Sequence, residues 1–222
     1  MAFGDEFYMS ETLYPIMLLG KGMHAIVVGG GDIALAKTEG LLLGGLTITV
    51  ISPELNCGLS NLAKDGKICW IQRAYQSPDL DDADLIFGCT NDNAVNTQVS
   101  KDAQARRKWV NIVDVNDLCT FYMPSVLRRG GFVLAVSTTG ASPALARKVR
   151  LFLEETFGEE WETFIDLMAA LRPELKDTIT DMDARREFVE RIWNSAALQL
   201  IRDGNTDGAK ELIRKCMSSS SA

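Results

Sequence analysis

An apolar run that leads directly into three glycines is the feature that most constrains this chain. Residues 25–28 are typical of a buried strand, Gly29, Gly30 and Gly31 follow, and a helical pattern begins near Asp32. Gly29 can make a tight turn, Gly31 lets the backbone approach a phosphate, and the unpaired N–H groups of the helix attract the anion. The junction predicts a pyrophosphate site, with a simple glycine turn as the alternative.

The residues that follow complete a strand-helix-strand unit. Helical periodicity continues over residues 37–43, and residues 46–51 are typical of the next strand. Past this strand, an acidic residue would bond the ribose hydroxyls, whereas a basic residue would favour a 2′-phosphate. Glu54 lies there, and no Lys or Arg occurs between Lys37 and Lys64. The sequence favours NAD over NADP as the cofactor.

Further strands predict an α/β fold with an N-terminal Rossmann-type parallel sheet. They are expected at residues 67–71, 84–89 and 109–113. Because ligands of such sheets lie outside the carboxyl ends of the strands, Thr90 and Asn91 fall on the cofactor side. Asp114 ends the last of these strands and is a candidate catalytic residue. The alternative is that Asn91 or Asp92 caps the following helix and that Asp114 caps the next segment.

Composition excludes several classes of function. His24 is the only histidine in 222 residues, which excludes a His-based metal site and a Ser-His-Asp triad. Five cysteines without a C-x-x-C pair argue against a disulfide framework, and a net charge of −7 argues against a nucleic-acid partner. No run is long enough for a membrane span, and residues 1–10 lack the pattern of a signal peptide. We expect a cytoplasmic protein that has no membrane partner.

One segment of this acidic chain is basic. Residues 118–153 contain no Asp or Glu, but they include Arg128, Arg129, Arg147, Lys148 and Arg150. The segment also contains a strand at 131–136 and a polar loop that ends at Ser142, a natural N-cap before Pro143. Basic side chains and a helix N-terminus both attract anions, so a substrate with several carboxylates would fit. A nonspecific basic face is the alternative.

The rest of the chain is expected to be helical. From Leu151 onward the pattern predicts helices broken at Pro173 and near Asp203, with an apolar stripe for packing. The stripe comprises Phe152, Phe157, Trp161, Phe164 and Leu167. We therefore expect three parts: an NAD-binding domain at 1–115, a linking and dimerisation segment at 116–150, and a helical domain at 151–222.

Six motifs, taken in order, resemble the siroheme synthase family. They are Tyr14-Pro-Ile-Met-Leu, Val27-Val-Gly-Gly-Gly-Asp-Ile-Ala34, Cys89-Thr-Asn-Asp92, Asn111-Ile-Val-Asp114, Phe121-Tyr-Met-Pro-Ser125 and the run from Ala135 to Arg147. The chain is similar to the precorrin-2 dehydrogenase/sirohydrochlorin ferrochelatase module of that family. This resemblance implies NAD-dependent oxidation of precorrin-2 to sirohydrochlorin, a tetrapyrrole, and a homodimer with exchanged elements. In bifunctional members it also implies insertion of ferrous iron.

The resemblance also implies roles for individual residues. Asp114 matches the family's catalytic aspartate and could hold iron transiently, since the chain offers no other metal ligand set. The nucleotide contacts carry over to Gly29, Gly30, Gly31, Asp32, Ile33, Pro53 and Glu54. Thr138 takes the place of a serine in the substrate loop, where Arg128, Arg129, Ser142 and Arg147 are our other candidates, and Thr139 stands where the family often has glycine. No methyltransferase module follows residue 222, so we expect no third activity.

The sequence is also compatible with two other functions. The first is an NAD-linked oxidoreductase that acts on another anionic substrate, although none of the four tyrosines begins a Tyr-x-x-x-Lys pair. The second is a non-catalytic regulatory domain that senses NAD, which would need a DNA-reading helix or a partner domain. Reduction of NAD in the presence of precorrin-2 separates these functions.

Overall fold

The computed structural model describes residues 12–218 and divides the chain into two compact units, Met1–Met123 and Pro124–Ala222. Residues 1–10, whose sequence lacks the pattern of a signal peptide, lie outside the described residues. No helix within residues 12–218 is long and apolar enough to cross a membrane.

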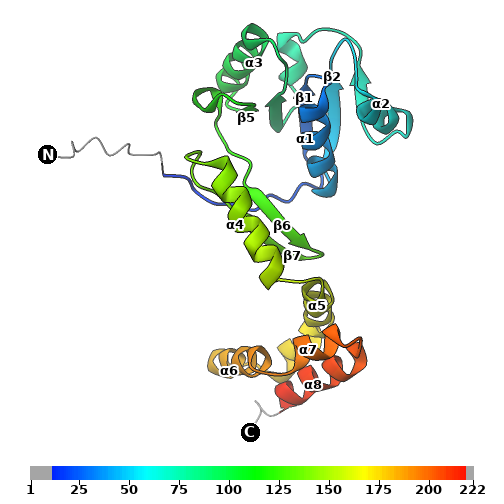
Figure 1. The fold of residues 1–222 in the computed structure, drawn as a ribbon, viewed down its shortest axis with the longest axis vertical. Helices are drawn as coiled ribbons and strands as arrows, with labels where there is room; N and C mark the ends of the chain where they lie inside the picture. Colours follow the sequence, from blue (N-terminus) through cyan, green and yellow to red (C-terminus); the bar gives the residue numbers. More distant parts are fainter. Residues whose placement is uncertain (1–11, 219–222) are drawn as a thin grey trace, which may run out of the picture. The chain divides into compact units, whose positions relative to one another are not determined.

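The first unit is built on a parallel sheet of five strands in the order β3-β2-β1-β4-β5 (Figure 1). The strands are β1 (His24–Val28), β2 (Thr47–Ile51), β3 (Cys69–Ile71), β4 (Leu85–Gly88) and β5 (Trp109–Ile112). The helices between them are α1 (Asp32–Leu43), α2 (Cys57–Lys64), the 3-10 turn η1 (Ser77–Leu80) and α3 (Asn93–Ala105). The α/β fold class is confirmed.

Alternating side chains of the strands separate two apolar cores. Ala25 and Val27 of β1 pack on one face with residues of α1 and α2, whereas Ile26 and Val28 pack on the other face with residues of α3. Successive side chains of a strand point to opposite faces, and both faces of a parallel sheet are covered by helices. This is why Ala25–Val28 of β1 and all of β4 lack polar side chains.

The chain beyond β5 stays with the first unit through hydrogen bonds to that strand. The amide of Thr120 donates to the carbonyl of Val110 at 2.8 Å, and the side-chain amide of Asn111 donates to the carbonyl of Phe121 at 3.0 Å. The short 3-10 helix η2 (Asn116–Leu118) lies along the chain between Asp114 and Thr120. The compact unit therefore ends at Met123 rather than at the end of the fifth strand.

The second unit begins with an antiparallel pair, β6 (Ser125–Arg129) and β7 (Phe132–Val136), joined through Gly130 at a φ of +52°. The sequence pattern predicted only the second of these strands. α4 (Pro143–Thr156) follows, then α5 (Glu160–Thr178), α6 (Met182–Trp193), α7 (Ala197–Arg202) and α8 (Thr206–Ser218). Helices α5 to α8 share an apolar core that includes Trp161, Phe164, Phe188 and Ile213.

Two details of the helical prediction are wrong. Pro173 lies inside α5 and does not end it, because Leu171 is buried and Leu175 packs against the same core on either side of the proline. Phe152 is 64% exposed on α4 and belongs to no core. The break near Asp203 is confirmed, since α7 ends at Arg202 and Gly204 takes a φ of +78°.

Candidate cofactor and active site

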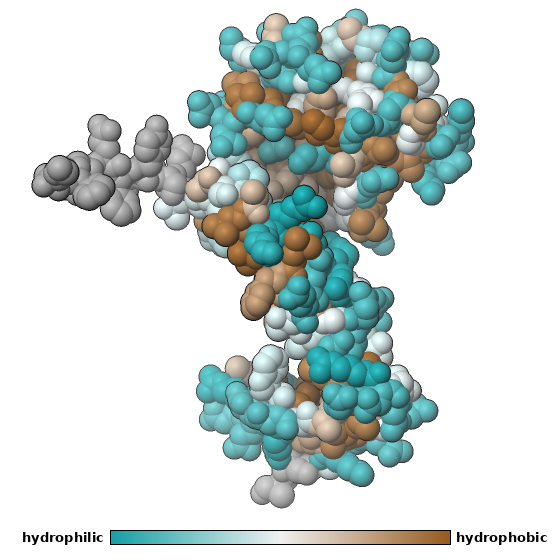
Figure 2. Space-filling view, viewed as in Figure 1, coloured by the Kyte–Doolittle hydropathy of each residue, from teal (hydrophilic) through white to brown (hydrophobic). Residues whose placement is uncertain are grey.

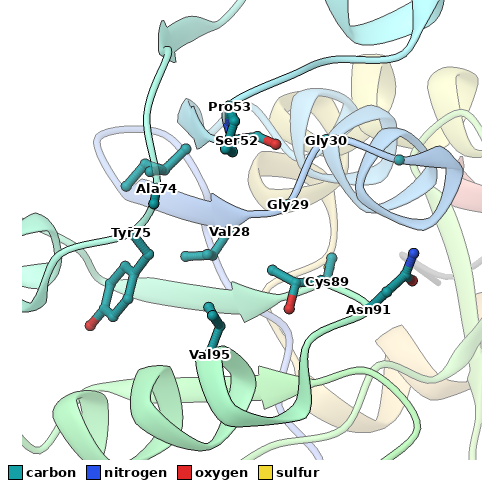
Figure 3. Close-up of a pocket in the computed structure, with 13 residues that line it drawn as sticks. Val28, Gly29, Gly30, Ser52, Pro53, Ala74, Tyr75, Cys89, Asn91 and Val95 are labelled. Carbon is teal, nitrogen blue, oxygen red and sulfur yellow. The ribbon is translucent and has the colours of Figure 1, made fainter.

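A cavity of about 310 Å³ opens at the carboxyl ends of the parallel strands (Figure 3). This volume lies within the range of about 300–1,000 Å³ that is usual for small-molecule sites. From β1 the chain proceeds outward to β2 and β3 and then crosses back to β4, so the strand order reverses between β1 and β4. Open α/β sheets bind ligands at such a switch point. The cavity is lined by Val28, Gly29, Gly30, Gly31, Ile51, Ser52, Pro53, Ala74, Tyr75, Cys89, Thr90, Asn91 and Val95.

The three glycines of the turn meet different surroundings. Gly29 has a φ of +126°, which L side chains rarely adopt, and a Cβ there would lie 2.5 Å from the carbonyl oxygen of Cys89. A Cβ at Gly30 would lie 1.9 Å from the carbonyl oxygen of Glu54. Gly31 has ordinary extended angles and nothing within 4 Å of an added Cβ. Packing requires the first two glycines, whereas the third leaves open space beside the cavity.

This open space fits a pyrophosphate group. Gly31 is the N-cap of α1, and no side chain caps the helix. The N–H groups of the first helical turn that lack intrahelical partners are available to an anion there, as they are in other dinucleotide sites. The turn therefore matches the phosphate-binding part of an NAD site.

Of the residues predicted to bind the cofactor, six line the cavity: Gly29, Gly30, Gly31, Pro53, Thr90 and Asn91. The other three, Asp32, Ile33 and Glu54, do not line it. Asp32 accepts a hydrogen bond from Asn56, Ile33 is 46% exposed, and Glu54 supplies the carbonyl that packs on Gly30. In Figure 3 the glycine turn lies between Ser52 and Pro53 on one side and Cys89 and Asn91 on the other.

The loop after β4 is fixed from within α3. Asn96 is 3% exposed, and its side-chain oxygen accepts hydrogen bonds from the amide and hydroxyl of Thr90 at 3.3 and 2.8 Å. Its side-chain amide donates to the carbonyl of Thr90 at 2.9 Å. Asp92 caps α3 by accepting from Ala94 and Val95. The capping alternative for this loop therefore applies to Asp92 and leaves Asn91 at the cavity.

The residues after β3 form a wall of the cavity that was not predicted from the sequence. Tyr75 lines the cavity, and its hydroxyl donates to a carboxylate oxygen of Asp102 at 2.8 Å. Burial and this hydrogen bond raise the pKa of Tyr75 well above its usual range. Arg73 holds the same loop through a two-pronged ion pair with Asp79, which lowers the pKa of that carboxyl group. The rule that identified Thr90 and Asn91 would also have identified Ala74 and Tyr75, since both pairs follow strands.

Cys89 contributes an uncharged wall to the cavity. Burial raises the pKa of its thiol to about 12, so the group is protonated at neutral pH. Cys89 and its neighbours Val28, Ile51 and Val95 give the cavity wall an apolar surface. A flat ring of a nucleotide can be buried against such a surface without leaving a charge unpaired.

Asp114 is exposed two residues beyond the end of β5, and its backbone takes a φ of +60°. This left-handed conformation is uncommon outside glycine, although Asp and Asn adopt it more readily than other residues. Non-glycine residues held in such conformations cluster at functional sites. Asp114 caps no helix, because the N-cap of η2 is Val115. The structure thus presents the carboxylate at the carboxyl end of the sheet without a helix-capping role.

Both ring nitrogens of His24, by contrast, are occupied by hydrogen bonds within the fold. Its two ring nitrogens lie 3.2 Å from the carbonyl oxygen of Asp82 and 2.9 Å from the hydroxyl of Thr49. It begins β1, so it is at the opposite end of the sheet from the glycine turn. Among residues 12–218, no group of three or more His, Cys, Asp and Glu residues could hold a metal ion.

The predicted substrate residues all lie in the second unit. Arg129 pairs with Glu159 at 3.5 Å and Arg150 pairs with Glu154, whereas Arg128, Arg147 and Lys148 are exposed and form no ion pair in the described chain. The basic segment therefore contains two classes of cation, those paired with an acid and those without an ion pair. The unpaired cations are the ones available to a ligand.

The loop before α4 is closed by its own hydroxyl groups. The Thr138 hydroxyl accepts from the amide of Ser142 and donates to its carbonyl, both at 3.0 Å, and the Ser142 hydroxyl caps α4 at the amide of Leu145. Thr139 has a φ of +52°, so it keeps at some strain the conformation that a glycine would adopt freely. The hydroxyls of Thr138 and Ser142 thus hold the loop in shape.

The sheet order, the glycine turn and the cavity together define a dinucleotide-binding protein. A family model described as putative NAD(P)-binding matches residues 16–125, and one described as the sirohaem synthase dimerisation region matches residues 160–217. The chain belongs to the siroheme synthase family.

Curated relatives agree with this assignment. The chain is 37% identical to the siroheme synthase of Pseudomonas entomophila over 87% of its length, and 33% identical to that of Methylobacillus flagellatus over 94%. It spans 42% and 44% of the length of these two relatives. A solved structure of SirC, a precorrin-2 dehydrogenase, matches with a TM-score of 0.74 and 25% identity. That match covers 91% of this chain and all of the solved one.

Proposed function

We propose that this protein oxidises precorrin-2 to sirohydrochlorin with NAD as the hydride acceptor. The observation that carries the proposal is the position of Asp114, exposed in a left-handed conformation at the same edge of the sheet as the glycine turn. The solved precorrin-2 dehydrogenase supports it, because all of that chain is matched by this one.

The chemistry divides between the cofactor and the chain. NAD, when bound, supplies the acceptor for a hydride that leaves a ring carbon of the substrate, and a proton must leave as well. Asp114 is the group that takes this proton, since it is a carboxylate at the strand end and no histidine lies there. The residues that line the cavity would hold the cofactor, and correct positioning of cofactor and substrate lowers the barrier of such a reaction.

The second unit supplies charge for the substrate. Arg128, Arg147 and Lys148 would attract the carboxylates of the tetrapyrrole, and the loop closed by Thr138 and Ser142 would present the N-terminus of α4 to them. Arg129, already paired with Glu159, would contribute less.

Two further properties belong to this proposal. A homodimer would bury the exposed apolar face of α4, where Leu145, Val149 and Phe152 recur at helical spacing. Brown side chains gather over this helix in Figure 2. Iron insertion into sirohydrochlorin is the second candidate activity, and it is favoured because the relatives are siroheme synthases. Asp114 would serve it as a transient ligand or proton acceptor. We also place the protein in the cytoplasm.

The deciding experiment is an anaerobic assay of NAD reduction with precorrin-2. Turnover that requires both compounds would support the dehydrogenase. Affinity for NAD without any turnover would favour the regulatory alternative, and turnover with a different anionic substrate only would favour the other oxidoreductase. Uptake of ferrous iron by sirohydrochlorin, measured on the same sample, tests the second activity.

A further inference from the structure

The glycine turn contains an electrostatic conflict. Helix α1 begins at Asp32, directly after Gly31, so a carboxylate stands in the same first turn whose N–H groups would receive the cofactor's phosphates. An acidic residue in this turn stabilises the free helix. It would, however, repel a pyrophosphate a few ångströms away, because like charges at such distances disfavour each other.

Asn56 occupies the position that resolves this conflict. Its side-chain Nδ2 donates to Oδ1 of Asp32 at 2.8 Å, and its backbone amide donates to the carbonyl of Gly30 at 2.8 Å. Its Oδ1 accepts from the amide of Leu59 at 2.9 Å and so caps α2. One residue thus joins the glycine turn, the first turn of α1 and the start of α2.

The orientation of the Asn56 amide is determined by its neighbours. The Leu59 amide can only donate, so the side-chain oxygen must face it and the NH₂ group must face the Asp32 carboxylate. A rotated amide would set oxygen against carboxylate and NH₂ against N–H. The donor to Asp32 is therefore a fixed feature of the site.

The packing around Gly30 leaves little freedom for this arrangement to shift. A Cβ at Gly30 would lie 1.9 Å from the Glu54 carbonyl oxygen and 2.7 Å from the Ser52 hydroxyl oxygen. The segment after β2 therefore lies directly on the glycine turn and carries Asn56 with it. Asp32, bonded to Asn56, does not line the cavity.

We propose that Asn56 is a positioning residue of the cofactor site, which draws the Asp32 carboxylate toward α2 and keeps the phosphate-binding turn open. The proposal rests on the proposed binding of NAD at this turn. Asn56 touches no reacting atom in this account, and its effect reaches the cofactor through Asp32 and through the Gly30 carbonyl.

Two substitutions separate this role from helix capping. Ser and Asp cap helices about as well as Asn does, so Asn56→Ser and Asn56→Asp both keep the acceptor for Leu59. Asn56→Ser removes the donor to Asp32, and Asn56→Asp replaces it with a second carboxylate. Both variants should melt within a few degrees of the wild-type protein. Asp181→Asn, a cap exchange at the start of α6, serves as the matched control.

NAD affinity, measured by calorimetry on the full chain, is the readout. We expect Asn56→Asp to weaken binding about tenfold at low ionic strength and Asn56→Ser to weaken it about threefold, the range set by the net contribution of one ordinary hydrogen bond. The deficit of Asn56→Asp should shrink as salt is added, because salt screens repulsion between charges. Asp32→Asn in the Asn56→Asp background restores one carboxylate paired with one amide, so it should recover most of the affinity.

The outcomes are distinguishable. Wild-type affinity in Asn56→Asp would overturn the inference while leaving NAD binding intact. A loss that is independent of salt and is not rescued by Asp32→Asn would also overturn it, since it would reflect capping or packing alone. A wild-type protein without NAD affinity would overturn the proposed function itself.

Discussion

Gly30 lies against the carbonyl oxygen of Glu54 so closely that a Cβ at this position would come within 1.9 Å of it, whereas its neighbour Gly31 faces open space. Two adjacent glycines of one turn are thus required for different reasons. Gly30 must lack a side chain because the segment after β2 packs against it. Gly31 would need to lack one because a bound ligand would fill the space beside it.

Replacing Gly31 with Val should block NAD binding with little damage to the fold. An added Cβ at this position has no protein atom within 4 Å, and the weaker N-cap costs at most about 1 kcal/mol. Calorimetry should show at least about a tenfold loss of affinity, which corresponds to ~1.4 kcal/mol. Gly30→Ala is the control and should destabilise the protein by about 2 kcal/mol or more. Unchanged NAD affinity in the Val variant would place the cofactor elsewhere.

Replacing Asp114 with Asn should abolish most of the dehydrogenase rate. Asn tolerates the left-handed backbone at this position, so the variant removes the base and keeps the conformation. The rate of NAD reduction with precorrin-2 should fall by about 10²- to 10⁴-fold, while NAD affinity is retained. Asp114→Ala should behave alike at a cost of about 1–2 kcal/mol in backbone strain. A variant that turns over at the wild-type rate would remove Asp114 from the mechanism.

The two classes of cation in the basic segment should respond differently to neutralisation. The double substitution Arg128→Gln and Arg147→Gln should raise the KM for the tetrapyrrole about tenfold and reduce its dependence on ionic strength. Arg150→Gln, whose charge is already paired with Glu154, is the matched control and should change KM less. Equal effects of the paired and unpaired arginines would contradict a substrate role for Arg128 and Arg147.

A charge on the exposed face of α4 should dissociate the proposed homodimer. Phe152→Asp replaces a side chain that is 64% exposed in the single chain with one that cannot be buried unpaired. Sedimentation should show a dissociation constant about 10- to 100-fold higher, the usual size of a lost interface anchor. Glu155→Ser on the same helix should have little effect. A monomeric wild-type protein would argue against this interface.

The ion pair that holds the Tyr75 loop should make stability depend on acid pH. Arg73 lowers the pKa of Asp79 below its ordinary value of 3.8, so the unfolded chain takes up the proton first as pH falls. The pair stabilises the fold fully above about pH 4, and this contribution is lost as pH falls through the lowered pKa. Thermal denaturation between about pH 2 and pH 6 should therefore show a shallower decline for Asp79→Asn than for the wild type.

Much of the first unit could be predicted from the sequence because its information is local. Apolar runs such as Ala25–Val28 are buried on both faces, and the glycines at their ends mark the turns. Asp114 and Thr90 could be placed at the functional edge because every strand of a parallel sheet ends on the same side. The exposed left-handed backbone of Asp114 was not predictable, since no neighbouring residue signals it.

Other features depend on contacts between distant segments. Pro173 is a helix breaker by its local chemistry, yet α5 continues through it because Leu171 and Leu175 pack against the core of the second unit. β6 was not predicted, because Arg128 and Arg129 mask the alternation of a strand whose buried residue is Leu127.

The sequence by itself determined the parallel α/β fold, the glycine turn and the acidic residue at the strand end, because each follows from the periodicity of one segment. Only the tertiary structure decided which residues line the cavity and which residues support its glycine turn. Tyr75, Val95 and Asn56 come from segments separated along the chain, and the order of the strands brings them to the glycine turn. Likewise, the pairing of Arg129 and Arg150 with acids was decided by packing, since charge along a sequence does not specify which charges meet.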